Sequence, residues 1–208
     1  MRFLTYFRTE IWAIFSITAV NVFKICFETM QKNKIALFLD RDGVINQKLP
    51  NAYVRHTKEF KILEGVAQAL DNLRRYFHPI VVVTNQQGIG KGLMSEQDLA
   101  HIHQTMQEQL QFKFDAIYHA PNLAAENSSL RKPNIGMAHL AQKDFPSIVF
   151  DRSLMVGDSL SDLEFGRKAN MKTVFIGNPS LKKPTEADFV FDSLSTLSHH
   201  IEQVLKLF

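Results

Sequence analysis

The sequence predicts an α/β fold: a doubly wound, Rossmann-like parallel sheet with helices on both faces and no separate cap domain. Two observations support this prediction. Short, almost wholly apolar segments such as 35–39 (IALFL) and 79–84 (PIVVVT) are typical of strands buried on both faces. Stretches of helical periodicity lie between these segments, so strands and helices alternate along most of the chain.

The expected elements follow one another from residue 35 onward. After the first strand, residues 64–76 carry Val66, Leu70 and Leu73 at helical spacing. After the second strand, a helix is expected over 95–110, with Ser95 as its N-cap. Further strands are predicted at 115–120, 153–158 and 172–177, and further helices near 135–144, 160–169 and 193–206.

Composition limits what the chain can be. Its 208 residues are 45% hydrophobic and 22% charged, which is typical of one soluble globular domain with a sizeable core. The net charge of +3 is small and spread along the chain, so it does not choose between a phosphorylated metabolite and a nucleic acid as partner. Cys26 is the single cysteine, which excludes an internal disulfide framework and a cysteine-based zinc site. We therefore expect a reducing compartment and a cytoplasmic protein.

The first 29 residues differ from the rest. Residues 11–23 carry no charged side chain, but they are fewer than the roughly 20 that a membrane-spanning helix needs. The following stretch, KICFETMQKNK, offers no cleavage site of the kind that signal peptides have. An amphipathic membrane anchor is one interpretation. The interpretation we favour is that 1–29 is an extension upstream of a true start at Met30, and that 30–208 is the folded domain.

Removal of residues 1–29 should leave folding and activity unchanged, because every motif and every predicted strand lies beyond Met30. Circular dichroism and turnover of a chain that starts at Met30 check this expectation. Aggregation of the shortened chain, or partition of the full chain into membranes, would contradict it.

Polar side chains stand at the ends of the predicted strands. Their positions are Asp40 and Asp42 after the first strand, Thr84, Asn85 and Gln86 after the second, Asp158 and Ser159 after 153–157, and Arg131 and Lys132 before the helix at 135. The carboxyl ends of parallel strands meet at one edge of a sheet, so these side chains should lie close together. Clustered carboxylates need positive charge, and an oxygen-only ligand set suits Mg²⁺. Thr84, Lys132 and backbone N–H groups would then hold an anion beside the metal, as in a phosphoryl-transfer site.

Four motifs in order resemble those of the haloacid dehalogenase superfamily of aspartate-nucleophile phosphatases. They are FLDRDGVIN, VVTNQQGIGKG, RKP and MVGDSLSDLEFGRKAN, and the resemblance extends from about residue 34 to 178. Within the superfamily, the combination of DRDGVIN, TNQ and RKP is similar to D-glycero-D-manno-heptose 1,7-bisphosphate phosphatases and histidinol-phosphate phosphatases. The phosphatase part of polynucleotide kinase/phosphatases is close to these.

The resemblance implies a role for each motif residue. Asp40 would attack phosphorus and form an aspartyl-phosphate, and Asp42 would be the general acid and base. Thr84 and Lys132 would bind the phosphoryl oxygens. Mg²⁺ would be held by Asp40, by Asp158 and by the backbone carbonyl of Asp42.

Further residues are expected around this centre. The candidate substrate-binding residues are Asn46, Tyr53, Asn85, Gln86, Arg131 and Ser159. Asp162 is left open between holding a metal-bound water, holding Lys132 and only capping a helix. The glycine-rich stretch 88–92 does not fit a Walker A loop and is expected to form a flexible edge of the site. His101 and His103 lie two apart on a helix and are expected to be surface residues.

One departure concerns zinc. The heptose and histidinol enzymes commonly have a zinc-binding loop before RKP, with ligands in CxH and CxC pairs. Here residues 118–133 read YHAPNLAAENSSLRKP, with Ala120, Asn122, Ser128 and Leu130 at the four ligand positions. No zinc is therefore expected, and because this loop helps shape the leaving-group pocket in the family, its change bears on the substrate more than on the chemistry.

The sequence as a whole predicts a Mg²⁺-dependent, capless phosphatase for a small sugar phosphate, most like the heptose bisphosphate enzyme. Histidinol phosphate is the second candidate substrate, with Glu126 as the acid in the 119–130 loop that could meet its ammonium group. A nucleic-acid 3′-end phosphatase is the third, and the loops lack the aromatic and basic interleaving that stacks bases. We expect a monomer with a small phosphorylated metabolite as partner, no nucleic acid and no stable membrane association.

Overall fold

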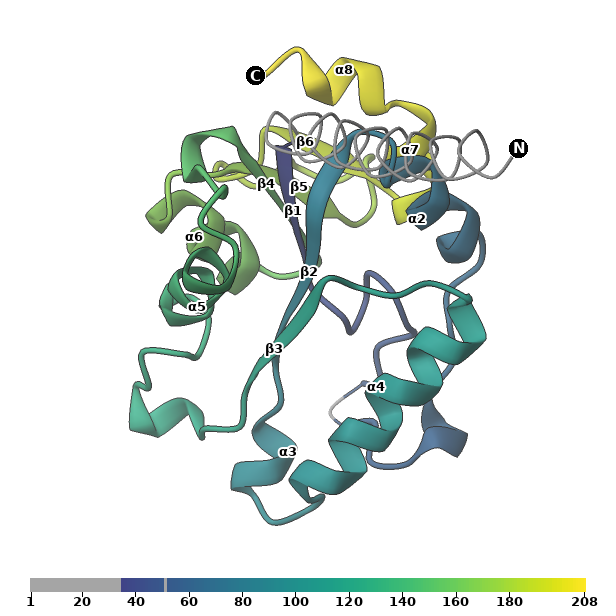
Figure 1. The fold of residues 1–208 in the computed structure, drawn as a ribbon, viewed down its shortest axis with the longest axis vertical. Coiled ribbons are helices and arrows are strands. Elements are labelled where there is room, and N and C mark those ends of the chain that lie inside the picture. The colour runs from purple at the N-terminus through teal and green to yellow at the C-terminus, as the bar shows by residue number, and fades with distance from the viewer. Residues whose placement is uncertain (1–34, 51) are drawn as a thin grey trace, which may run out of the picture. The chain divides into compact units, whose positions relative to one another are not determined.

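The computed structural model describes residues 35–50 and 52–208, and its core is a parallel sheet (Figure 1). The strands are β1 (Ile35–Leu39), β2 (Phe77–Asn85), β3 (Ala116–Ala120), β4 (Ser153–Gly157), β5 (Lys172–Ile176) and β6 (Phe189–Phe191). Their order is β3-β2-β1-β4-β5-β6, and every neighbouring pair is parallel. This confirms the predicted doubly wound α/β fold.

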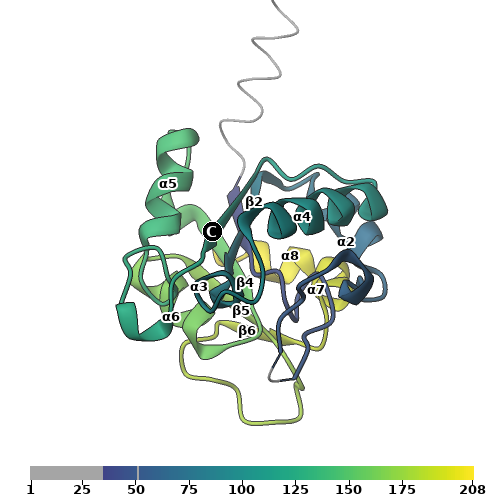
Figure 2. The same ribbon diagram turned by 90° about the horizontal axis from the view of Figure 1, so that it is seen from below.

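Helices cover both faces of the sheet (Figures 1 and 2). They are α2 (Val66–Leu73), α3 (Gln87–Gly90), α4 (Glu96–Leu110), α5 (Gly136–Asp144), α6 (Leu160–Lys168), α7 (Leu194–His199) and α8 (Ile201–Leu205). Short 3₁₀ turns, η1 (Thr57–Glu59), η2 (Ala124–Glu126) and η3 (Phe150–Arg152), connect some of them. The described residues 35–208 form one compact unit, in which no cap domain is separate from the sheet.

The central strands show why their sequences have no polar face. In β1, Leu37 and Leu39 point into the core under α2, α4, α7 and α8, whereas Ala36 and Phe38 point into the core under α5 and α6. All four side chains are at most 3% exposed. A strand with a helical layer on each side must be apolar at every position, which is what IALFL provides.

The structure confirms the strands and helices predicted from the sequence and changes three details. The helix expected at 193–206 is divided into α7 and α8 at His200, whose ring Nδ1 hydrogen-bonds the Thr196 carbonyl at 2.9 Å. Part of the expected 88–92 loop forms the single turn α3. Strand β6 is an additional edge strand of three residues, too short for an alternating pattern to identify.

The prediction that His103 is a surface residue was wrong. His101 is exposed, but His103, two residues on, is only 9% exposed and lies against the sheet side of α4. Helical geometry separates the directions of the two side chains, as expected, but the burial of one of them depends on packing that the sequence does not display. No helix of the described residues has the length and hydropathy of a membrane span. The extension at 1–29 lies outside the described residues.

Candidate active site

The candidate site lies at the carboxyl ends of β1 and β4. The chain moves outward from β1 to β2 and β3 on one side, and then to β4, β5 and β6 on the other. This reversal opens a crevice beyond the strand ends, where ligands of such sheets bind. Asp40 directly follows β1 and Asp158 directly follows β4, so the fold brings two acids of the first and fourth motifs together.

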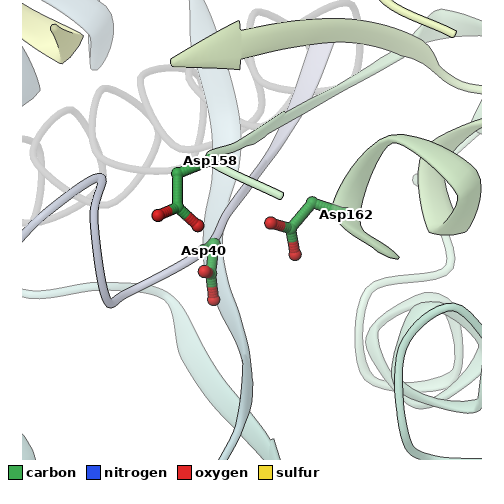
Figure 3. A group of neighbouring side chains, drawn as sticks. All are labelled: Asp40, Asp158 and Asp162. Carbon is green, nitrogen blue, oxygen red and sulfur yellow. The ribbon is translucent and has the colours of Figure 1, made fainter. Parts of the chain in front are cut away.

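Three carboxylates from three different segments gather there (Figure 3). Asp40, Asp158 and Asp162 offer oxygen atoms that all lie within 4.8 Å of one another. Among the described residues, this is the group of histidine, cysteine and carboxylate side chains that could hold a metal ion. None of these three carboxylates comes from the loop at 118–133.

Two close approaches depend on glycine. Gly43 has φ of +92°, and a Cβ there would lie 2.1 Å from Oδ2 of Asp158. A Cβ on Gly157 would lie 2.2 Å from Cβ of Asp162. Both distances are far below contact, so these two glycines leave the space into which the carboxylates fit.

Lys132 neutralises part of this negative charge. Its Nζ lies 2.8 Å from Oδ1 of Asp40 and 2.6 Å from Oδ1 of Asp162, and it also donates to the Val83 carbonyl at 2.7 Å. Its side chain is 2% exposed. The backbone of Lys132 is in turn held by Asn85, which donates to its carbonyl and accepts from its N–H, at 3.1 and 3.0 Å.

Asp162, whose role the sequence left open, has two functions in this arrangement. One carboxylate oxygen lies against Lys132. The other accepts hydrogen bonds from the backbone N–H and the hydroxyl of Ser159, at 3.0 and 2.6 Å, and so caps α6. The candidate substrate ligand Ser159 is thus engaged in the cap, although it also lines the pocket.

The carboxyl group of Asp40 has a raised pKa. Burial raises the pKa of Asp40 to about 7, although the ammonium of Lys132 acts in the opposite direction. Asp162 and Asp42 add to the increase through like-charge repulsion. Burial also raises the pKa of Asp158, although Lys48 donates to both of its oxygens at 2.9 and 2.7 Å. A divalent cation would favour the ionised form of both carboxyl groups.

The donor set fits magnesium. Asp40 is buried and Asp158 half-buried, and their carboxylate oxygens lie within 4.8 Å of one another. Among the described residues, no nitrogen or sulfur ligand belongs to this cluster. Asp162 is already occupied by Lys132 and the helix cap, so it suits an outer position better than a direct ligand. The Asp42 carboxylate is engaged by Arg41, Asn46 and Gln86, and the backbone carbonyl of Asp42 is the metal ligand that the resemblance implies.

The Asp42 carboxylate is fixed by four hydrogen bonds. Arg41 Nη2 donates to both oxygens at 2.9 Å, Asn46 donates to Oδ1 at 2.9 Å, and Gln86 donates to Oδ2 at 2.9 Å. Burial alone would raise the pKa of Asp42, but Arg41 and the amide donors hold it below its usual range. Asn46 and Gln86, which were expected to contact substrate, lie buried behind Asp42 and hold this acid in place.

An open pocket of about 490 Å³ lies over these groups. Of the residues predicted from the sequence, its lining includes Asp40, Asp42, Tyr53, Thr84, Asn85, Arg131, Lys132 and Ser159. Lys48 and Lys91 add positive charge to its wall. The Thr84 hydroxyl, only 1% exposed, accepts a hydrogen bond from Gln86 at 2.8 Å and keeps its own proton for an anion.

Sequence reasoning missed three residues of this site: Arg41, Lys48 and His103. A signal was present for Arg41, because a cation between two aspartates in sequence can pair with one of them, and it does pair with Asp42. Lys48 and His103 carried no local signal, since their contacts with Asp158 and Arg41 span 110 and 62 residues of sequence.

The fold and the site define a haloacid dehalogenase-like phosphatase, an enzyme that hydrolyses phosphoric monoesters. The family model described as Polynucleotide kinase 3 phosphatase matches residues 34–192. The chain belongs to this family of phosphatases.

Relatives within the family have more specific names. A D-glycero-alpha-D-manno-heptose-1,7-bisphosphate 7-phosphatase of Mycobacterium bovis is 41% identical over 166 residues, which are 76% of this chain and 86% of the relative. A D-glycero-beta-D-manno-heptose-1,7-bisphosphate 7-phosphatase of Vibrio cholerae is 35% identical over 83% of this chain and 99% of the relative.

A solved structure is similar as well. The D,D-heptose 1,7-bisphosphate phosphatase of B. bronchiseptica, complexed with magnesium and phosphate, matches with a TM-score of 0.73 and 28% identity. The match covers 82% of this chain and 99% of that one.

Proposed function

We propose that this chain is a Mg²⁺-dependent sugar bisphosphate phosphatase that removes the 7-phosphate of D-glycero-D-manno-heptose 1,7-bisphosphate through an aspartyl-phosphate. The observation that carries the chemistry is the grouping of Asp40, Asp158 and Lys132 beside the separately held Asp42. The substrate rests on the names of relatives that match over most of this chain.

The first step uses the two aspartates of the first motif. Asp40 attacks phosphorus in line, so its carboxylate oxygen becomes bonded to the phosphoryl group as the bond from phosphorus to the sugar oxygen breaks. Lys132 and the Thr84 hydroxyl hold the other phosphoryl oxygens, because charge spreads over these oxygens in the transition state. Mg²⁺, held by Asp40 and Asp158, would offset the repulsion between the nucleophile and the phosphate dianion.

Asp42 handles the protons. The substrate phosphate brings negative charge close to Asp42 and raises its affinity for a proton, so the acid enters the first step protonated and gives this proton to the leaving alkoxide. The resulting carboxylate then removes a proton from the water that hydrolyses the aspartyl-phosphate. The four hydrogen bonds to Asp42 favour its ionised form and so suit this second step.

Comparison of substrates tests the proposal. The values of kcat/KM with Mg²⁺ should be highest for heptose 1,7-bisphosphate, tested as both anomers, and far lower for histidinol phosphate and for a 3′-phosphorylated oligonucleotide. A higher value for the oligonucleotide would favour the polynucleotide activity after which the family model is named. Against that activity, Tyr53 is the one aromatic side chain in the described pocket lining, which gives a strand of bases little to stack on.

Activity should require Mg²⁺ and should not change when zinc is removed, because the ligand set is all oxygen and the 118–133 loop has no cysteine. Metal analysis of the purified protein, together with assays after treatment with a zinc-selective chelator, checks this prediction. One zinc per chain, or activity lost with the zinc, would contradict it.

Arg131 should determine substrate preference. It lines the pocket, and its Nη1 donates to the Asn122 carbonyl at 3.3 Å, which leaves other guanidinium donors for a distant phosphate or sugar hydroxyls. Arg131→Ala should lower kcat/KM for heptose bisphosphate roughly 10- to 100-fold, the value of a charge-assisted hydrogen bond, and spare 4-nitrophenyl phosphate. The exposed Arg152→Ala is the matched control. Equal losses on both substrates would refute this role.

A further inference from the structure

Arg41 is the largest fully buried charged side chain of the described residues, and it takes no direct part in the reaction steps proposed for Asp40 and Asp42. It stands between Asp40 and Asp42 and is 0% exposed. Its Nη2 donates to both oxygens of Asp42, whereas its Nε has no acceptor among the described residues. The orientation of the guanidinium therefore depends on what its Nη1 contacts.

That contact is His103, on helix α4. Nη1 of Arg41 lies 3.3 Å from Nε2 of His103, and the two residues are 62 positions apart in the chain. Arginine is always protonated and can only donate, so Nε2 of His103 must be the acceptor and the imidazole is neutral. Burial and the nearby Arg41 lower the pKa of His103 to about 3, which agrees with a neutral ring.

His103 is itself fixed by its surroundings. It is 9% exposed, and its ring lies edge-on to that of His119, with centroids 6.5 Å apart. His119 is on β3, and its Nε2 lies 2.8 Å from a carboxylate oxygen of Glu96 at the start of α4. The imidazole acceptor is thus anchored by a strand and a helix rather than by a loop.

We propose that His103 is a positioning residue for the general acid and base: by accepting a hydrogen bond from Arg41, it fixes the guanidinium plane that orients the Asp42 carboxylate toward the leaving group. This inference rests on the proposed function, because it assigns to Asp42 the proton that the leaving oxygen needs. His103 touches neither substrate nor metal in this arrangement, and its effect should be confined to steps in which Asp42 moves a proton.

Two substrates of similar size separate this role from a structural one. 4-Nitrophenyl phosphate releases a weakly basic phenolate that departs without a proton, whereas 4-nitrobenzyl phosphate releases an alkoxide that needs one. The ratio kcat/KM reports the reaction only up to departure of the leaving group, when the aspartyl-phosphate forms. A misplaced Asp42 should therefore lower kcat/KM for the benzyl ester and leave the phenyl ester nearly unchanged.

The matched variants are His103→Met and His103→Gln. Both side chains are unbranched and similar in size, but glutamine has an oxygen that can accept from Arg41 and methionine has none of comparable strength. His103→Met should lose roughly tenfold or more in kcat/KM on the benzyl ester and less than threefold on the phenyl ester, as expected for impaired general acid catalysis. His103→Gln should recover most of that loss, and the exposed His101→Met should behave like the wild type.

Each outcome decides the question. Equal losses on both esters, or equal losses in the methionine and glutamine variants, would overturn the proposal. If His103→Met does not fold, His103→Leu takes its place, because leucine also offers no acceptor to Arg41; it should show the same selective loss on the benzyl ester relative to His103→Gln, and a uniform loss would count against the proposal. A wild type that hydrolyses neither the two esters nor heptose 1,7-bisphosphate with Mg²⁺ would instead refute the proposed function, so the two failures are distinguishable.

Discussion

Asp40→Asn should abolish phosphate ester hydrolysis while the chain stays folded. The amide has nearly the volume of the carboxylate but is not a nucleophile, so the aspartyl-phosphate cannot form and kcat should fall by several powers of ten. Steady-state assays with 4-nitrophenyl phosphate and heptose bisphosphate measure the loss. Mass spectrometry of the quenched wild type should show a phosphoryl adduct on the peptide that contains residue 40, and the variant should show none.

The control for this variant is Asp71→Asn, which changes an exposed aspartate on α2. Lys132 keeps its contacts with Asp162 and the Val83 carbonyl when Asp40 becomes neutral, so thermal unfolding should change little. Activity above about a tenth of the wild type in a folded Asp40→Asn protein would rule out the aspartyl-phosphate mechanism, because that loss corresponds to only about 1.4 kcal/mol of activation free energy.

Replacement of Lys132 should have the second largest effect, a loss of roughly 10²- to 10³-fold in kcat on every substrate, as when one preorganised donor to a transition-state oxygen is removed. Lys132→Met removes the ammonium and keeps the length of the chain. Because Nζ bridges two buried carboxylates, the substitution also leaves Asp40 and Asp162 without a counter-charge, and the protein should be less stable.

The double variant Lys132→Met/Asp162→Asn separates these two effects. It removes one charge of each sign, so the melting temperature should recover while kcat stays low. Recovery of activity together with stability would show that Lys132 supports the fold and not the transferring phosphoryl group.

The sequence was sufficient to predict the fold and the main carboxylates for a definite physical reason. Strands buried on both faces must be apolar throughout, and parallel strands place their carboxyl ends at one edge, so Asp40 and Asp158 could be located without any contact being known. Lys132 was expected near them because it stands before the helix at 135, and the resemblance of its motif supported its role toward the phosphoryl group. These inferences depend on properties that are local in sequence or general to the fold class.

The contacts among the side chains that hold Asp42 in place could not be predicted from the sequence. The contact between Arg41 and His103 depends on the rotation of α4 about its axis, and in sequence His103 looks like any other histidine on an exposed helix. Asn46 and Gln86 were expected to contact substrate, but the direction of their side chains, toward Asp42 and not the pocket, is set by packing. Strand β6 has only three residues, which is too few for a hydrophobic pattern to identify it. The break between α7 and α8 at His200 leaves the helical spacing of apolar residues unchanged, so the sequence does not indicate it.

The fit of Gly43 against Asp158 makes the first and fourth motifs a single unit for mutation. The two residues lie more than a hundred positions apart, yet a methyl group at position 43 would occupy the space of the Asp158 carboxylate. The effects on activity of substitutions at the two positions should therefore be non-additive. A substitution at either position already displaces the Asp158 carboxylate, so a second substitution at the other position has less further effect. A design that transfers either motif into another scaffold would have to transfer both, because the Asp158 carboxylate of the fourth motif fits only where Gly43 of the first motif leaves space for it.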